Sequence, residues 1–135
     1  MPANTTPIFP LTPKISWGVI ATANTAYDGT GTVVSVFTAG ANGSRIDYLK
    51  ARAKGTNVAT VLRVFVNNGA DPTVATNNAL FMERTIPATT ISAVAETQDV
   101  VVPLDLSLPV GYKINITIGT TVAAGLVITA IGGDY

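Results

Sequence analysis

The sequence predicts an all-β protein: an antiparallel β-sandwich of jelly-roll type, with about eight strands and an extended, proline-rich N-terminal arm. Three observations lead there. Short runs of β-branched and aromatic residues recur along the whole chain. Clusters of Gly, Pro and Asn separate these runs at the roughly ten-residue intervals typical of sandwiches. Little of the chain fits a helix: Arg45–Lys54 allows a helical interpretation, and Thr89–Glu96 fits either one helical turn or an irregular segment.

Residues 1–14 are expected to form the arm, because Pro2, Pro7, Pro10 and Pro13 exclude a helix and favour an extended path. Apolar residues lie between these prolines, so the arm either packs back on its own domain or docks on a neighbouring chain. The candidate partner-binding residues are the prolines and apolar side chains of its second half: Pro7, Ile8, Phe9, Pro10, Leu11 and Pro13.

Residues 15–135 are expected to form a single sandwich domain. Its first strand is Ile15–Thr22, whose Trp17 we expect in the core. The second strand, Val33–Thr38, follows a Gly-rich turn. We interpret Arg45–Lys54 as a third strand, because Gly55-Thr56-Asn57 follows at once and would lead into the next strand as a hairpin.

The fourth strand lies in Val58–Gly69, the run richest in β-branched residues, and is predicted to be central because both its faces are apolar. Asn67-Asn68-Gly69 then tolerates the positive φ of a tight turn. Arg63 is the exception in this strand. A buried guanidinium needs a partner such as Glu83, but we favour a position in which the Arg63 stem packs and its head reaches water at an edge.

Four further strands complete the sandwich. Ala79–Ile86 ends at Pro87, and Pro103 directs Thr97–Leu106 towards a sheet edge or a bulge. Tyr112–Ile118 alternates apolar and polar residues, as a strand with one buried face does. Leu126–Ile131 is the last strand.

Composition excludes several function classes. Eight Lys/Arg balance eight Asp/Glu, so nucleic-acid binding is not expected. The chain has no His and no Cys, which excludes Ser-His-Asp and Cys-His catalysis and thiolate metal sites. The longest apolar run, Val122–Ile131, is shorter than the ~20 residues of a membrane helix. No signal peptide is recognisable at the N-terminus, and neither a cofactor, a metal nor a small-molecule substrate is expected.

Three sets of polar residues were weighed as sites and are interpreted as structural. A hydrolase would need a carboxylate pair, and the candidates are Asp99 with Asp105 and Glu83 with Glu96. Loop oxygens suited to calcium belong to Asn67, Asn68 and Asp71, but their spacing does not match a calcium-binding loop. A basic stripe suited to a polyanion comprises Arg45, Lys50, Arg52 and Lys54, with Tyr48 among them. We interpret it as a solvated strand face or a subunit contact.

The order of several segments resembles a known group of proteins. After the arm come Ser44–Ala51, Gly55-Thr56-Asn57 and Val61–Gly69, and the chain continues through Leu108–Lys113 and Ile118–Gly125. This order is similar to that of small virion structural proteins of tailed phages and prophages, of the head decoration (cement) type. The resemblance implies a β-sandwich that assembles as homotrimers on the capsid surface, binds the major capsid protein and stabilises the head. It also implies synthesis in the host cytoplasm and no enzymatic activity.

A second hypothesis belongs to a different class. The chain would be a receptor- or glycan-binding β-sandwich module of a phage tail or fibre. Such a module binds sugars through exposed aromatic rings, and the candidates in loops are Tyr27, Tyr112 and Tyr135.

Overall fold

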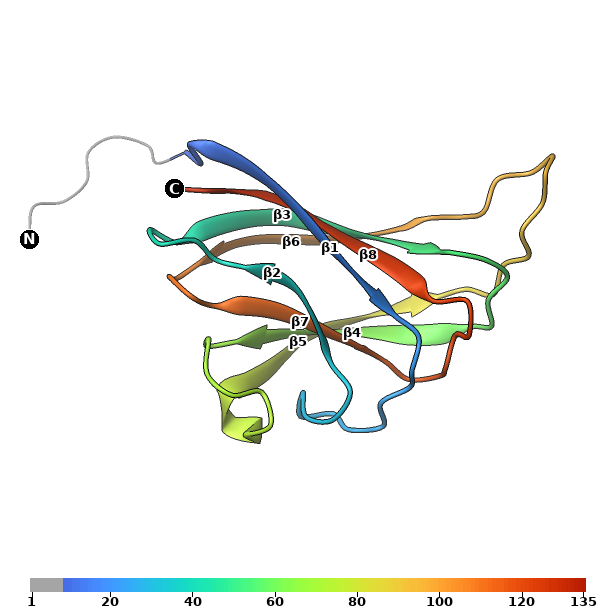
Figure 1. Cartoon of the computed structure of the whole chain (residues 1–135), viewed down its shortest axis with the longest axis horizontal. Helices are drawn as coiled ribbons and strands as arrows, with labels where there is room; N and C mark the ends of the chain where they lie inside the picture. Colours follow the sequence, from blue (N-terminus) through green and yellow to red (C-terminus); the bar gives the residue numbers. More distant parts are fainter. Residues whose placement is uncertain (1–8) are drawn as a thin grey trace, which may run out of the picture.

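The computed structural model describes residues 9–135, which form eight β-strands and one short 3₁₀ helix, η1 (Ala75–Asn77) (Figure 1). The strands in chain order are β1 (Thr12–Ile20), β2 (Val34–Thr38), β3 (Ser44–Ala53), β4 (Thr60–Asn67), β5 (Asn78–Ile86), β6 (Val100–Leu108), β7 (Lys113–Ile118) and β8 (Leu126–Asp134).

The strands build two four-stranded sheets that pack face to face. Sheet A has the order β1-β8-β3-β6, and sheet B has the order β2-β7-β4-β5. Four antiparallel pairs follow the pattern of one long hairpin that is folded over on itself. They are β1·β8, β2·β7, β3·β6 and β4·β5. This is the strand order of a jelly roll, so the predicted fold class is confirmed.

The core lies between the sheets and consists of aliphatic side chains with Phe37. Leu49 and Ile46 on β3 meet Leu62 and Val64 on β4, and all four are fully buried. At about 25 cal/mol per Å² of buried apolar surface, this layer is the main source of stability. β4 lies between β7 and β5, so its predicted central position is also confirmed.

The predicted start of the first strand and the predicted hairpin after the third strand were wrong. β1 begins at Thr12 instead of Ile15, so Thr12, Pro13 and Lys14 pair with β8 and are not part of an arm. Pro13 fits there because β1 is an edge strand and Pro13 is close to its start. Residues 55–57 do not form a hairpin turn. They carry the chain from β3 in sheet A to β4 in sheet B.

The predicted alternation of β3 is interrupted by a β-bulge at Asp47. The register with β8 shifts between Ile46 and Tyr48, so Ile46 points into the core together with Leu49 although the two are an odd number of residues apart. The bulge brings β3 very close to β8. A side chain at Gly132 would collide with the carbonyl oxygen of Arg45, so only glycine fits at this position.

Candidate functional site

Of the predicted partner-binding residues, those from Phe9 onward lie at the beginning of the described chain. Pro7 and Ile8 are outside the described residues. Phe9 and Leu11 are exposed, and the Leu11 N–H donates to the Asp134 carbonyl over 2.8 Å. Pro10 lies so close to Gly133 that a β-carbon added to Gly133 would collide with the Pro10 ring. The end of the predicted arm therefore runs beside the C-terminal end of β8.

The candidate catalytic carboxylates are separate from one another. Glu83 pairs with Arg63, Asp99 with Lys50 and Asp105 with Arg45. The hydrogen bond from Lys50 holds the pKa of Asp99 below its usual value. Glu96 lies in the exposed connection between β5 and β6. Across residues 9–135, no group of three acidic, His or Cys side chains is placed to hold a metal ion.

The loop oxygens considered for calcium are engaged in turns. Asn67 Oδ1 accepts the Gly69 N–H over 2.8 Å, and Asn68 Oδ1 accepts the Ala70 N–H. Asp71 Oδ1 accepts the N–H and the hydroxyl of Thr73, bonds that lower the Asp71 pKa. These side chains shape the β4–β5 connection by side-chain-to-backbone bonds typical of Asn and Asp in turns.

The three tyrosines considered for glycan binding contact different parts of the molecule. Tyr27 lies over the Arg63 guanidinium, 4.1 Å from it to the ring centroid. Tyr112 packs against the core, and the Tyr135 hydroxyl lies 3.0 Å from Ser107 Oγ.

The basic stripe is largely paired. Lys50 Nζ lies 2.8 Å from Asp99, and Arg45 bonds Asp47 as well as Asp105. Arg52 donates to the Thr97 hydroxyl over 2.9 Å. Lys50, Arg52 and Lys54 line a shallow hollow beside Val127 and Thr129, on the outer face of sheet A. This hollow lies within a larger surface that also exposes apolar side chains.

That surface is the outer face of sheet A, which we call the bare face. Strand register places its side chains in three rows across the sheet. The rows are Ile15–Ile131–Tyr48–Pro103, Trp17–Thr129–Lys50–Val101 and Val19–Val127–Arg52. Ile15, Trp17, Val19 and Val101 are all exposed. Among residues 9–135, nothing covers this face.

The prediction that Trp17 lies in the core was wrong. Its side chain is on the outward side of β1, and the residue is 67% exposed. The inward positions of β1 belong to Ser16, Gly18 and Ile20: the Ser16 hydroxyl donates to the Val36 carbonyl, and a side chain at Gly18 would collide with Val34. Trp17 therefore lies between two other exposed apolar side chains on the outward side of β1, Ile15 and Val19.

The outer face of sheet B, which we call the covered face, has the opposite character. Residues 21–33, the connection between β1 and β2, run along it from end to end. The Asn24 N–H donates to the Ile118 carbonyl over 2.7 Å, and the Asn78 amide donates to the Asp28 carbonyl over 3.1 Å. Figure 1 shows this connection on the side of sheet B that points away from sheet A. We call residues 21–33 the cover.

Arg63 lies beneath the cover, not at an edge as we favoured, and is 5% exposed. Its Nε donates to Glu83 over 3.0 Å, and its Nη1 donates to the Asn24 carbonyl over 2.9 Å. The alternative prediction, a Glu83 partner, is therefore confirmed. β4 is an inner strand, so a side chain on its outer face reaches the cover before it reaches water.

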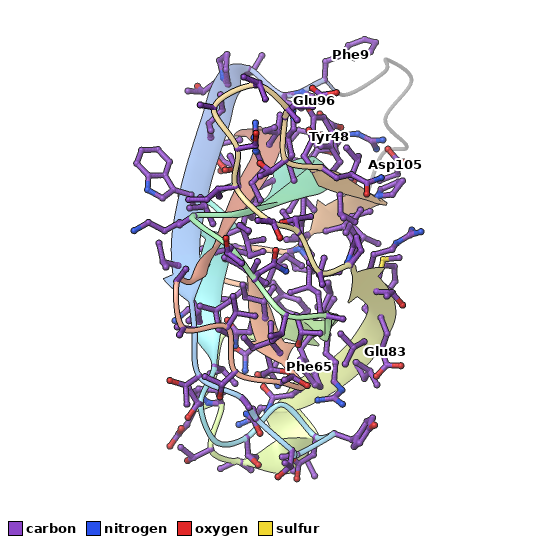
Figure 2. All side chains as sticks on the ribbon, turned by 90° about the vertical axis from the view of Figure 1, so that its right-hand side faces the viewer. Phe9, Tyr48, Phe65, Glu83, Glu96 and Asp105 are labelled. Atoms are coloured by element: carbon purple, nitrogen blue, oxygen red, sulfur yellow. The ribbon has the colours of Figure 1, made fainter. Side chains whose placement is uncertain are left out.

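Other polar groups are buried on the covered face. Asn115 and Thr117 on β7 lie opposite Phe65 and Arg63. Neither Asn115 Oδ1 nor Thr117 Oγ1 has a hydrogen-bond partner among the residues that the structure describes. Figure 2 shows Phe65 and Glu83 in this lower layer, below Tyr48 and Asp105 of sheet A. Over β7 and β4 the covered face is thus closed by the chain itself, although Leu80 and Phe81 on β5 are exposed, whereas the bare face is open.

Comparison with protein-family models, with curated proteins and with solved structures finds no significant match. No helix within residues 9–135 is both long and apolar enough to cross a membrane.

Proposed function

We propose that this chain is a non-catalytic structural protein of a virus particle, a decoration protein that binds the major capsid protein and stabilises the shell. The observation that carries the proposal is the bare face, where Ile15, Trp17 and Val19 are exposed on β1 at one edge and Val101 is exposed on β6 at the other. Monomeric soluble proteins rarely expose large apolar patches, and those that occur mark interaction sites.

Two further features support the proposal. Jelly rolls recur in viral shells, although a fold alone does not determine function. Charged residues make up only 12% of the chain, which suits a protein partly covered by its neighbours. Decoration requires adhesion and no reacting group, so buried area and shape would determine affinity. The resemblance to phage decoration proteins adds self-association, with trimers as its implied order.

The test is co-sedimentation with shells assembled from the major capsid protein of the same virus. We expect the wild-type protein to sediment with the shells and Val101→Glu to bind about tenfold or more weakly, because a charge would be buried at the contact. Val94→Glu is the matched control, since Val94 is a fully exposed valine in the β5–β6 connection. Equal binding of both variants, or no binding of the wild type, would contradict the proposal.

The arm needs a separate variant. A deletion of residues 1–9 ends before Pro10, which lies against Gly133, and before Leu11, whose N–H bonds to Asp134. We expect this deletion to weaken shell binding without changing the thermal unfolding of the sandwich. Unchanged binding would show that Pro7, Ile8 and Phe9 are not in the contact.

One observation favours a second candidate, the glycan-binding module. The exposed Trp17 and three residues that carry hydroxyl groups, Ser16, Ser35 and Thr38, line one hollow between β1 and β2. Flat aromatic rings beside hydrogen-bonding groups are the usual elements of sugar sites. Trp17 is the only tryptophan, so a glycan that stacks on it would shift the fluorescence of the protein. A glycan array without a hit would contradict this candidate.

A further inference from the structure

Among residues 9–135, four strands lie at sheet edges: β1 and β6 in sheet A, and β2 and β5 in sheet B. An edge strand presents unpaired backbone N–H and C=O groups that can pair with another chain. Proteins normally block such edges with bulges, prolines, charges or short strands. The four edges of this sandwich differ in how well they are blocked.

Three of the edges carry these blocking features. β2 has only five residues, and its register with β7 shifts between Ser35 and Phe37. The register of β5 with β4 also shifts, and the charged Glu83 and Arg84 follow on β5. β6 contains Pro103 in its middle, and its Asp105 has a φ of 51°, which bends the strand at a bulge.

The β1 edge is not blocked by such features. β1 pairs with β8 in continuous register over nine residues, from Thr12 opposite Asp134 to Ile20 opposite Leu126. Pro13 lies at the start of the strand, where it blocks little. Lys14 is the only charged residue of β1, and its ammonium is held by Asp134 at 3.2 Å and by the Thr38 carbonyl. In Figure 2 the blue β1 ribbon runs along the left margin of the molecule.

We propose that β1 pairs with β1 of a second copy of this chain, antiparallel about a twofold axis, with Trp17 opposite Trp17 of the other copy. The two A sheets would then join into one continuous sheet. In this register Ile15 of one copy faces Val19 of the other, so all three outward apolar residues of β1 meet an apolar partner. The unpaired backbone groups of both edges are satisfied at the same time.

Charge and symmetry favour a second copy as the occupant. The chain has no net charge, so two copies do not repel each other. The register places Lys14 opposite Ile20 and away from the other Lys14. A twofold contact is closed, so pairing stops at the dimer. The pairing does not depend on shell binding. It predicts a dimer, whereas the resemblance to decoration proteins implies a trimer.

The register can be tested by cross-linking, because the chain contains no cysteine. Directly opposite residues of an antiparallel pair have Cα atoms about 4.5–5.5 Å apart, within the range of a disulfide. We expect Trp17→Cys to form a covalent dimer under mild oxidation with oxidised glutathione. Val19→Cys is the control, since its two copies would lie roughly 13 Å apart along the paired strands. Equal cross-linking of both variants would overturn the register.

The pairing of the two β1 edges can be tested by measuring the mass of the protein in solution. Light scattering over a range of concentrations should give a dimer for the wild type. Trp17→Lys places two like charges at the centre of the pairing and should weaken dimerisation about tenfold or more. Val101→Lys introduces the same charge on the same face at the protected β6 edge and should leave dimerisation unchanged. A monomer or a trimer for the wild type, or equal weakening by both variants, would overturn the proposal.

Discussion

The two outer faces of this sandwich differ in both composition and cover. The outer face of sheet B carries Arg63, Asn115 and Thr117, and the cover buries them. The outer face of sheet A carries Ile15 and Trp17, and both are exposed. On these two faces, therefore, some polar side chains are buried while some large apolar side chains are exposed, although the core between the sheets is apolar.

The difference shows that connections, and not only residue type, decide which face is buried. In β7, residues 114–118 are all buried, because the core covers one face and the cover lies along the other. In β1 the exposed and half-buried residues alternate, as expected for a sheet with one open face. The polar side chains of the covered face are buried within the chain and need polar partners, whereas the bare face leaves apolar area exposed.

The largest expected contrast is between two aromatic residues. Phe65 on the covered face is fully buried, so Phe65→Ala should lower the free energy of unfolding by about 3–5 kcal/mol. Trp17→Ala removes a larger side chain from the bare face and should change it by no more than about 0.5 kcal/mol. Urea denaturation followed by circular dichroism measures both variants, because Trp17→Ala removes the fluorescent probe.

These measurements belong at low protein concentration, where the monomer is the species that unfolds. A loss above about 2 kcal/mol for Trp17→Ala would mean that the bare face is packed in the monomer, since only buried side chains of this size contribute so much. A small loss for Phe65→Ala would mean that the covered face is loosely packed. Either result would remove the contrast between the faces.

The second prediction compares an ion pair beneath the cover with one on the bare side. Glu83→Gln leaves the buried Arg63 guanidinium without its counter-charge and should lower stability by about 1–2 kcal/mol. The loss is smaller than for a fully buried pair, because the Glu83 side chain is 43% exposed. Asp105→Asn interrupts the exposed pair with Arg45 and should change stability by less than about 0.5 kcal/mol. Thermal unfolding of both variants near pH 7 measures this difference, and equal losses would contradict it.

Much of the fold follows from the sequence, because local residue patterns determine strands and turns. The run around Leu62 and Val64 identified the central strand, and Pro103 correctly indicated an edge with a bulge. The jelly-roll type of sandwich was predictable, because about eight short strands without helices have few compact arrangements. The start of β1 was missed because prolines suggested an arm, although an edge strand tolerates one.

The faces could not be predicted in the same way. Hydrophobicity placed Trp17 inside and a charged head placed Arg63 at an edge, and both assignments were wrong. Their burial depends on where residues 21–33 lie, which is a long-range property of the chain. The bulge at Asp47 also changed which β3 residues point inward, and no local pattern in residues 45–54 signals it.

The third prediction concerns the end of sheet A at Asp134. In the described part of the chain no cover lies over this end, and polar contacts stabilise it. The Asp134 carboxylate accepts from the Ser44 hydroxyl and from Lys14, and these contacts lower its pKa below the usual value of an aspartate. Because the pKa is lower in the folded state, the unfolded chain binds more protons than the folded chain does as the pH falls. The Asp134 contribution is therefore complete above about pH 5 and is lost as the pH falls through the lowered pKa.

Asp134→Asn isolates this contribution. The variant should be less stable than the wild type by about 1 kcal/mol near pH 7, and the difference should shrink below pH 4. Asp28, Asp71 and Asp99 also have lowered pKa values, so the wild-type protein should lose stability in acid even where the variant matches it. Urea midpoints from pH 2 to pH 7 measure the difference, and a constant difference across that range would contradict the assignment.

The smallest expected effect tests the polar interior of the covered face. Thr117 Oγ1 is buried without a hydrogen-bond partner in the described residues, so Thr117→Val removes a desolvated hydroxyl and keeps the shape. Its stability should stay within about 0.5 kcal/mol of the wild type or rise. Thr60→Val is the matched control on β4, because the Thr60 hydroxyl donates to the Thr120 carbonyl over 3.1 Å and accepts the Thr120 N–H over 2.9 Å. That variant should lose about 1–2 kcal/mol. A comparable loss from Thr117→Val would mean that the Thr117 hydroxyl is hydrogen-bonded beneath the cover and helps to hold the cover in place.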